Sequence, residues 1–170
     1  MITRKIMLLG EMAVGKTSIA NRLKFDRFHV EYKSTLGVEI YHYDVEPSPA
    51  PVPFKFLIWD TDGNVGDAIF RERQMRGAQG AIVIGDLTRR ETLEHQMAIA
   101  EKFAANFPGR YVATVLNKSD LADEFPSEKN YLPAGLRDGL FPTFTTSAKT
   151  GDNVRTTFHA AAATIVRREQ

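Results

Sequence analysis

The sequence of 170 residues contains no cysteine. Without a thiol the chain forms no disulfide, offers no cysteine ligand to a metal and cannot be prenylated or palmitoylated. Met1-Ile2 also lacks the glycine that N-myristoylation requires. No apolar run approaches the length of a membrane span, and no secretory signal precedes the first predicted strand. We therefore expect a soluble, cytoplasmic chain with no lipid anchor.

An excess of charge of one sign is also missing. Lys and Arg total 22 against 21 Asp and Glu, a net charge of +1, and there is no long basic run. This balance argues against a nucleic-acid partner. The 43% hydrophobic and 25% charged content is typical of a globular protein with a real core. We expect a single domain over residues 1–170, acting as a monomer.

Strand-like and helix-like patterns alternate along the chain, which predicts an α/β fold with a mostly parallel sheet and helices on both faces. The second and third strands are joined by a short connection, and a parallel crossover needs about a dozen residues, so this pair should be antiparallel. Strands are predicted over residues 3–9, 38–45, 54–59, 81–85, 111–116 and 141–145, and helices over residues 16–25, 67–75, 91–107 and 153–167. A short helix is also expected within residues 127–137, where Pro133 and Gly135 interrupt the pattern.

Residues Gly10 to Thr17 read Gly-Glu-Met-Ala-Val-Gly-Lys-Thr, the G-x-x-x-x-G-K-[ST] pattern of a phosphate-binding P-loop between a strand and a helix. Backbone N–H groups and the helix N-terminus would bind phosphate oxygens. Lys16 would place its charge on the outer phosphates, and the Thr17 hydroxyl would bind Mg²⁺. A chance match in a glycine turn is the alternative. The residues expected around the phosphates are Gly10, Glu11, Met12, Ala13, Val14, Gly15, Lys16, Thr17 and Ser18.

Two further polar clusters follow predicted strands, where open α/β sheets bind ligands. Asp60-Thr-Asp-Gly63 offers a carboxylate for Mg²⁺ and a glycine whose backbone can approach a γ-phosphate, although an ordinary turn has the same composition. In Asn117-Lys-Ser-Asp120, the Asp120 carboxylate matches the two adjacent N–H donors of guanine, which adenine lacks. Backbone N–H groups after the last strand would receive guanine O6. The residues expected at the base are Asn117, Lys118, Asp120, Ser147, Ala148 and Lys149.

Together these motifs resemble the Ras superfamily of small GTPases, and the Rab branch most closely. The resemblance implies a three-layer P-loop NTPase fold of the Ras-like G-domain type, with six strands of which one is antiparallel. It also implies a GTP/GDP switch that uses Mg²⁺. The matching residues are Gly10–Thr17, Thr35, Asp60–Gly63, Asn117–Asp120 and Ser147–Lys149.

The resemblance assigns roles to further residues. Thr35 would bind Mg²⁺ through its hydroxyl and the γ-phosphate through its N–H, so the metal set is Thr17, Thr35 and Asp60. Phe28 would lie against the guanine, with a core contact as the alternative. Effector and regulator proteins would contact the switch regions, which are Asp26–Leu36 and Asp60–Arg76, together with Trp59, for which core packing is the alternative.

The chain departs from the family at two positions beside the expected γ-phosphate. Asn64 stands where the family has the glutamine that orients the attacking water, and it is one methylene shorter. Met12 stands where the family has a small residue, and its side chain either crowds the water or points outward. The resemblance makes Lys16, Thr35, Gly63 and Asn64 the catalytic set, and the departures predict slow hydrolysis. A nucleotide-stabilised interaction module without turnover is the alternative, while Asn117–Asp120 disfavours an ATPase or kinase.

Several arginines lie near these motifs without belonging to them. Arg71, Arg73 and Arg76 are expected on a solvated face, although one of them acting in cis on the γ-phosphate is an alternative. Arg89 and Arg90 are expected to be surface charge near the start of a helix.

Overall fold

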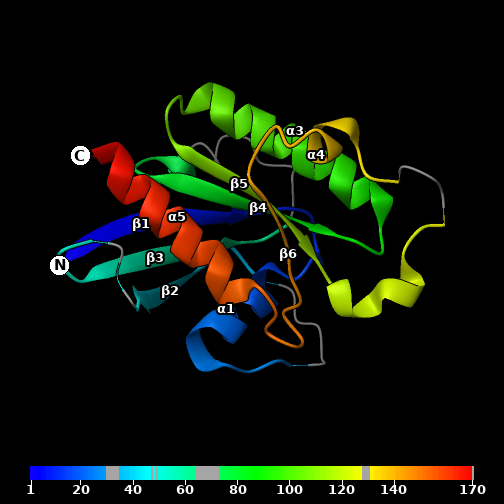
Figure 1. Cartoon of the computed structure of the whole chain (residues 1–170), viewed down its shortest axis with the longest axis horizontal. Coiled ribbons are helices and arrows are strands. Elements are labelled where there is room, and N and C mark those ends of the chain that lie inside the picture. Colours follow the sequence, from blue (N-terminus) through cyan, green and yellow to red (C-terminus); the bar gives the residue numbers. More distant parts are fainter. Residues whose placement is uncertain (30–34, 47, 49, 64–72, 128–130, 170) are drawn as a thin grey trace.

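The computed structural model describes residues 1–29, 35–46, 48, 50–63, 73–127 and 131–169. Its framework is a six-stranded sheet in the order β2-β3-β1-β4-β5-β6 (Figure 1). β2 pairs with β3 in antiparallel fashion, and the other neighbouring strands pair in parallel, as the sequence predicted. The strands are β1 (Ile2–Leu9), β2 (Val38–Val45), β3 (Phe54–Thr61), β4 (Gly80–Asp86), β5 (Tyr111–Asn117) and β6 (Thr143–Thr145).

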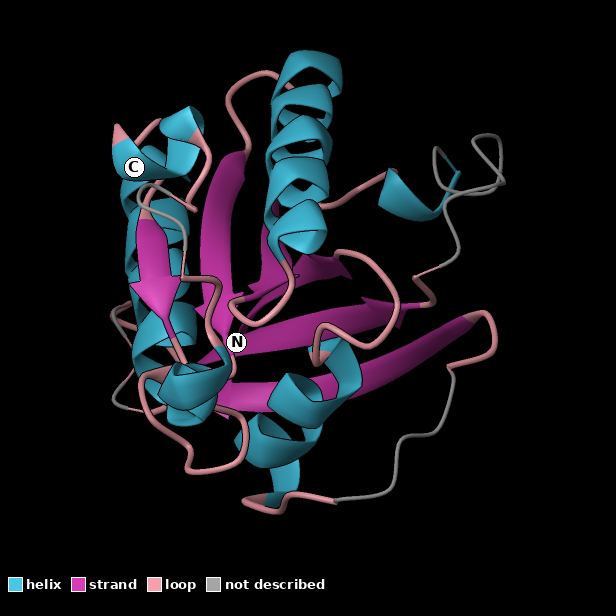
Figure 2. Ribbon diagram, turned by 90° about the vertical axis from the view of Figure 1, so that its right-hand side faces the viewer, coloured by secondary structure: helices cyan, strands magenta, loops and turns pink. Residues whose placement is uncertain are grey.

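Helices cover both faces of this sheet and complete three layers (Figure 2). α1 (Lys16–Phe25) and α5 (Val154–Glu169) bury apolar side chains such as Leu23 and Phe158 in one core. On the opposite face, α3 (Arg90–Asn106) buries Phe103 against β1 and β4, and α4 (Ala134–Arg137) adds Leu136 to a smaller cluster. The predicted α/β class is therefore confirmed.

One local prediction is confirmed and another differs from the structure. The short helix expected within residues 127–137 is Ala134–Arg137 in the part of this segment that is described, and Pro133 occupies its N-cap position. Proline commonly starts a helix but interrupts one from within, which accounts for the late start. Ser119–Glu124, expected to begin as an open loop, forms a 3-10 helix called η1. Of the helix expected over residues 67–75, residues 73–75 are described and are helical.

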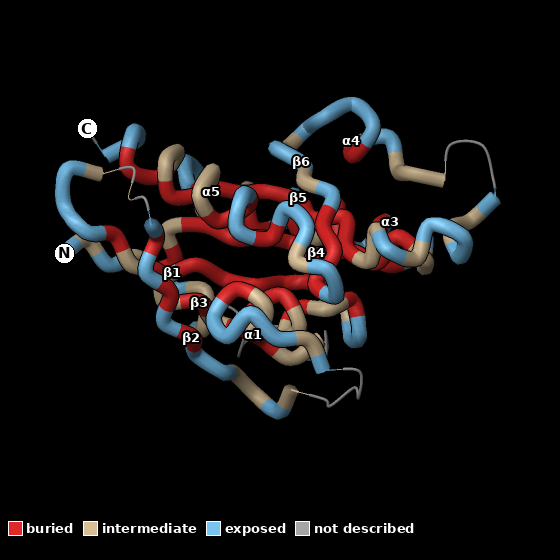
Figure 3. Tube along the Cα trace, turned by 60° about the horizontal axis from the view of Figure 1, so that its bottom comes forward, coloured by how far each residue is buried: buried red, intermediate tan, exposed pale blue. Residues whose placement is uncertain are grey.

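The central strands are the most deeply buried part of the molecule (Figure 3). Every residue of β4 and of β5 is buried, because helices cover both faces of the sheet here. Since β1, β3, β4, β5 and β6 run in parallel, the segments that follow them emerge at the same edge of the sheet. Polar residues far apart in the sequence are thereby brought together. Among the described residues, no helix is both long and apolar enough to cross a membrane.

Candidate functional site

The P-loop connects β1 to α1 and closes around its own lysine. The ammonium group of Lys16 donates to the carbonyl oxygens of Gly10 at 2.9 Å and Glu11 at 2.7 Å, and only 6% of the residue is exposed. Gly15, at the N-cap of α1, has φ of 105°, and a Cβ there would lie 2.2 Å from Nδ2 of Asn117. A side chain at position 15 is therefore excluded by both backbone strain and contact with the neighbouring loop.

The remaining loop residues differ in exposure. Val14 is fully buried in the core, whereas the Met12 side chain is half-exposed at 51%. Ala13 adopts a left-handed conformation with φ of 63°. The Glu11 carboxylate contacts Nδ1 of His95, which ties the loop to α3. The loop is thus anchored on one side by the core and on the other by a helix, with Met12 facing outward between them.

Three oxygen-bearing side chains converge beside the first turn of α1. The Thr17 hydroxyl donates to Oδ2 of Asp60 at 2.5 Å, and the Thr35 hydroxyl lies 2.7 Å from that of Thr17. Ser18 follows in the same turn and is partly buried. This brings together the three residues predicted to bind metal, which come from positions that are widely separated in the sequence.

The Asp60 carboxylate is fully buried, and its Oδ1 has no hydrogen-bond partner among the described residues. Burial raises the pKa of Asp60 to about 6, while the Thr17 hydroxyl and the charge of Lys16 act in the opposite direction. A buried carboxylate oxygen without a donor is costly unless a cation or a hydrogen bond satisfies it. With two hydroxyls beside it, this oxygen fits the all-oxygen coordination that Mg²⁺ prefers.

Gly63 lies directly against the backbone of the P-loop. A Cβ at this position would be 2.2 Å from the backbone nitrogen of Met12 and 2.5 Å from its Cα. The neighbouring Asp62 N–H donates to the carbonyl oxygen of Gly37 at 3.0 Å, which joins the segment after β3 to the segment before β2. Asn64 lies outside the described residues, so its predicted role stays a prediction.

Asn117, at the end of β5, joins three loops. Its Nδ2 donates to the carbonyl oxygen of Val14 at 3.0 Å. Its Oδ1 accepts from the Thr146 hydroxyl at 3.0 Å and from the Ala148 N–H at 3.2 Å. The residue is only 1% exposed, and its amide holds the P-loop next to the two loops predicted to bind the base.

The two base-side loops also contact each other at their outer ends. The Ser147 hydroxyl donates to Oδ1 of Asp120 at 2.6 Å, and Asp120 is exposed at the edge of the site, as is Lys149. The Ser147 N–H donates to the carbonyl oxygen of Asp152 at 3.1 Å. Because the Ala148 N–H already donates to Oδ1 of Asn117, a guanine O6 at this place would have to share that donor with Asn117.

Two residues support these loops from α1 and the segment after it. Arg22 donates through Nε to the carbonyl oxygen of Ala148 at 2.9 Å and also contacts that of Lys149. Phe28 is partly buried against the core cluster that includes Val14 and Ala148. Phe28 therefore makes a core contact, which was its alternative role, and its predicted contact with the base stays a prediction.

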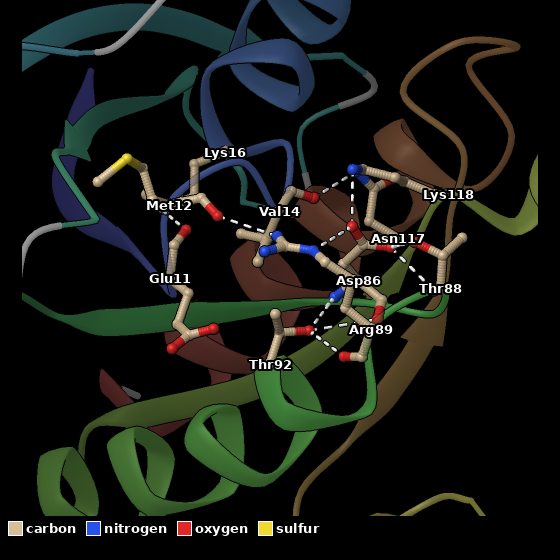
Figure 4. A network of polar contacts seen from close by, with 10 residues as sticks. All are labelled: Glu11, Met12, Val14, Lys16, Asp86, Thr88, Arg89, Thr92, Asn117 and Lys118. Atoms are coloured by element: carbon tan, nitrogen blue, oxygen red, sulfur yellow. Dashed lines mark hydrogen bonds and ion pairs between the residues drawn. The ribbon is translucent and has the colours of Figure 1, made fainter. Parts of the chain in front are cut away.

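One prediction about charge is wrong. Arg89, expected as surface charge, donates through Nε to the buried Asp86 carboxylate at 3.0 Å and through Nη2 to the carbonyl oxygen of Met12 at 2.9 Å (Figure 4). Lys118 also pairs with Asp86, at 2.7 Å. Arg90, in contrast, pairs with the exposed Glu94. Sequence reasoning missed Asp86, although its place at the end of a buried strand, like that of Asp60, was a usable signal.

The predicted partner surface is described in part, since residues 30–34 and 64–72 lie outside the described ranges and Arg71 with them. Trp59 is partly buried, with the Lys5 ammonium 3.5 Å from its ring centroid. Its cross-strand partner Ile40 is 46% exposed, and Leu36 is 91% exposed. Arg73 and Arg76 are exposed, as a solvated face predicts.

A protein-family model described as the Ras family matches residues 5–167. The chain belongs to the Ras family. It is 34% identical over 158 residues to Ras-related protein RABA4b of Arabidopsis thaliana, which covers 91% of this chain and 69% of that protein. It is 33% identical over 165 residues to human Ras-related protein Rab-36, covering 94% of this chain and 60% of Rab-36. This Ras-family chain is thus a Rab-like small GTPase, as its motifs predicted.

Proposed function

We propose that this Ras-family chain binds GTP and GDP together with Mg²⁺ and hydrolyses GTP slowly, switching between two states. The observation that carries the proposal is the buried Oδ1 of Asp60, which lacks a hydrogen-bond partner within the described residues and lies next to the hydroxyls of Thr17 and Thr35. Mg²⁺ held by these three residues would neutralise charge on the phosphates.

The switch depends on two residues that meet the same part of the site from different segments. Thr35 approaches α1 through the Thr17 hydroxyl, and Gly63 lies against the Met12 backbone. Both would contact the γ-phosphate, so both contacts would be lost when hydrolysis removes it. The segments that carry them are joined by the hydrogen bond from Asp62 to Gly37, which supports a coupled response.

Guanine selectivity would come from Asp120. Its carboxylate is exposed at the edge of the site and accepts the Ser147 hydroxyl at 2.6 Å, which leaves acceptor capacity for the two adjacent donors of guanine. Adenine would leave this capacity unused and would place its own N1 acceptor opposite the carboxylate. A polar site of this kind rejects the analogue that lacks the matching group by about 10⁴–10⁵.

The proposed slow rate rests on the residues near the γ-phosphate. Lys16 would provide positive charge at the phosphates. The Asn64 side chain is one methylene shorter than glutamine, so its amide would lie too far from the attacking water to orient it well. The half-exposed Met12 stands next to Gly63, where an arginine supplied by a partner would have to approach. We therefore expect a weak response to GTPase-activating proteins as well as a low intrinsic rate. Multiple-turnover release of phosphate separates this enzyme from a module without turnover.

Effectors and regulators would bind the surface beside the switch segments. Leu36 and Ile40 expose large apolar side chains there, and Ile40 lies opposite Trp59 on the neighbouring strand. Exposed apolar groups of this kind favour protein partners. We further propose that the whole of residues 1–170 acts as one G domain and as a monomer.

The test of the proposal is the nucleotide preference of wild type and Asp120→Asn. Wild type should bind GDP, and Asp120→Asn should lose GDP affinity and gain affinity for xanthosine diphosphate, whose base offers an acceptor opposite the new amide. Binding is measured by displacement of a fluorescent nucleotide. A wild-type protein that does not bind GDP, or a variant with unchanged preference, would overturn the proposal.

A further inference from the structure

Asp86 is a fully buried carboxylate that the nucleotide-binding motifs do not include. It lies at the end of β4 and is surrounded by donors (Figure 4). The Thr88 N–H and hydroxyl donate to its Oδ1 at 2.9 and 2.7 Å. Its Oδ2 pairs with Nζ of Lys118 at 2.7 Å and accepts from Nε of Arg89 at 3.0 Å. One carboxylate oxygen therefore holds two cations.

These two cations belong to opposite sides of the nucleotide site. Lys118 is part of the Asn-Lys-Ser-Asp loop predicted to bind the base, and its side chain is 31% exposed. Arg89 donates through Nη2 to the carbonyl oxygen of Met12 in the P-loop, at 2.9 Å. Asp86 thus connects a lysine of the predicted base-binding loop to the P-loop through Arg89, which has no role in the proposed chemistry.

The energetics of this arrangement favour a fixed geometry. A buried carboxylate is stable only while its charge and hydrogen bonds are satisfied, so Asp86 holds both cations in defined positions. Lys118 has a flexible four-carbon stem, and without Asp86 its ammonium would sample many positions. Arg89 reaches the Met12 carbonyl with one nitrogen while another is held by Asp86, so the two bonds of its planar group support each other.

We infer that Asp86 is a positioning residue for nucleotide binding, which fixes the ammonium of Lys118 at the base side and, through Arg89, the Met12 carbonyl of the P-loop. This inference rests on the proposed function. Asp86 would slow the release of nucleotide and take no part in choosing the base, because the hydrogen bonds that Asp86 and Arg89 make within the described residues do not include Asp120.

The experiment measures dissociation of a fluorescent N-methylanthraniloyl GDP from wild type, Asp86→Asn and Arg89→Gln by competition with excess GDP. Asp86→Asn keeps the shape of the side chain and removes its charge. We expect both variants to release GDP about tenfold to a hundredfold faster, because removing one partner of a buried charge pair acts mainly on the dissociation rate. Arg89→Gln, at a side chain that is 35% exposed, keeps the test decisive if Asp86→Asn does not fold.

Three further variants separate positioning from a loss of stability. Val166→Ala, on the buried face of α5, should lower stability without touching the network and should leave the release rate unchanged. Arg90→Gln is the matched charge control, since Arg90 pairs with exposed Glu94. In the double variant Asp86→Asn/Arg89→Gln, the acceleration of GDP release should be smaller than the product of the two single accelerations. The free-energy changes should be less than additive because both residues act through one link.

Three results would contradict the inference. The first is a release rate in Asp86→Asn and Arg89→Gln equal to that of wild type, and the second is an equal acceleration in Val166→Ala at matched stability. The third is a changed preference between GDP and inosine diphosphate, which would make Asp86 a base-selecting residue instead. A wild type that binds no GDP overturns the proposed function itself, and is distinguished from these results by the wild-type signal alone.

Discussion

The Thr17 hydroxyl donates to the Asp60 carboxylate across 2.5 Å, which joins the first turn of α1 to the end of β3. The second oxygen of that carboxylate is buried and has no partner within the described part of the chain. One oxygen of Asp60 is therefore held by the protein, and the other is the oxygen that the proposed Mg²⁺ would satisfy. Substitution of Asp60 should therefore have opposite effects on the protein with and without bound nucleotide and Mg²⁺.

Asp60→Asn should stabilise the protein when nucleotide and Mg²⁺ are absent, and weaken their binding when they are present. Removing a buried charge without a cation partner should raise the free energy of unfolding by about 1–2 kcal/mol. Thermal unfolding with EDTA, and again with excess GTP and Mg²⁺, measures both effects. Asp44→Asn, at an exposed side chain, is the surface control and should change neither. An Asp60→Asn protein that is less stable in EDTA would contradict this view of the site.

Gly63→Ala should affect the triphosphate state more than the diphosphate state. The added Cβ would lie 2.2 Å from the Met12 backbone nitrogen, so the segment must move away from the P-loop. The expected result is faster release of GTP, by about tenfold or more, with release of GDP close to that of wild type. Measuring both rates in the same variant provides its own control. Equal acceleration for the two nucleotides would show general damage to the site.

Asn64→Gln should accelerate single-turnover hydrolysis of GTP. The longer side chain would bring its amide about 1 Å closer to the attacking water, and a displacement of that size is worth up to about 10²-fold in rate. Met12→Gly, made alone and together with Asn64→Gln, tests whether the methionine also obstructs the water. If Asn64→Gln cleaves GTP no faster than wild type, the proposed reason for slow hydrolysis is wrong.

Asp86 should make a contribution to stability that depends on pH. Burial on its own would raise the pKa of Asp86, but Lys118, Thr88 and Arg89 together lower it below its ordinary value. The folded state then binds protons less readily than the unfolded chain, so the stabilisation is present above about pH 4 and is lost as the pH falls below it. Thermal unfolding from about pH 6 to about pH 3 should show a difference between wild type and Asp86→Asn that shrinks toward acid. A constant difference would argue against this charge pairing.

The parts of the site that follow from local pattern were predictable from the sequence. Gly15 and Lys16 indicate a P-loop in the sequence because phosphate binding needs a glycine turn directly before a helix. Asp60 and Asn117 were found because they end buried strands, and the parallel sheet brings strand ends together. The convergence of Thr17 and Thr35, in contrast, came from the family resemblance and not from any spacing.

What the sequence did not reveal depends on contacts between distant segments. Arg89 and Met12 are 77 residues apart, and no periodicity links them, so a charged residue near a helix start was interpreted as solvated. The hydrogen bond forms only because β4 places Asp86 beside the P-loop, which is a property of the assembled sheet. The short length of α4, in contrast, followed from local pattern, because Pro133 and Gly135 interrupt the helical composition within residues 127–137.

The central claim is that a single site selects guanine through Asp120 and binds the phosphates through the P-loop with Mg²⁺. Isothermal titration calorimetry of the nucleotide-free protein with GDP, and separately with ADP, in the presence of Mg²⁺ tests it most directly. The account predicts tight binding of GDP and binding of ADP that is weaker by about 10⁴-fold or undetectable. Equal heats from the two nucleotides, or none from GDP, would contradict it.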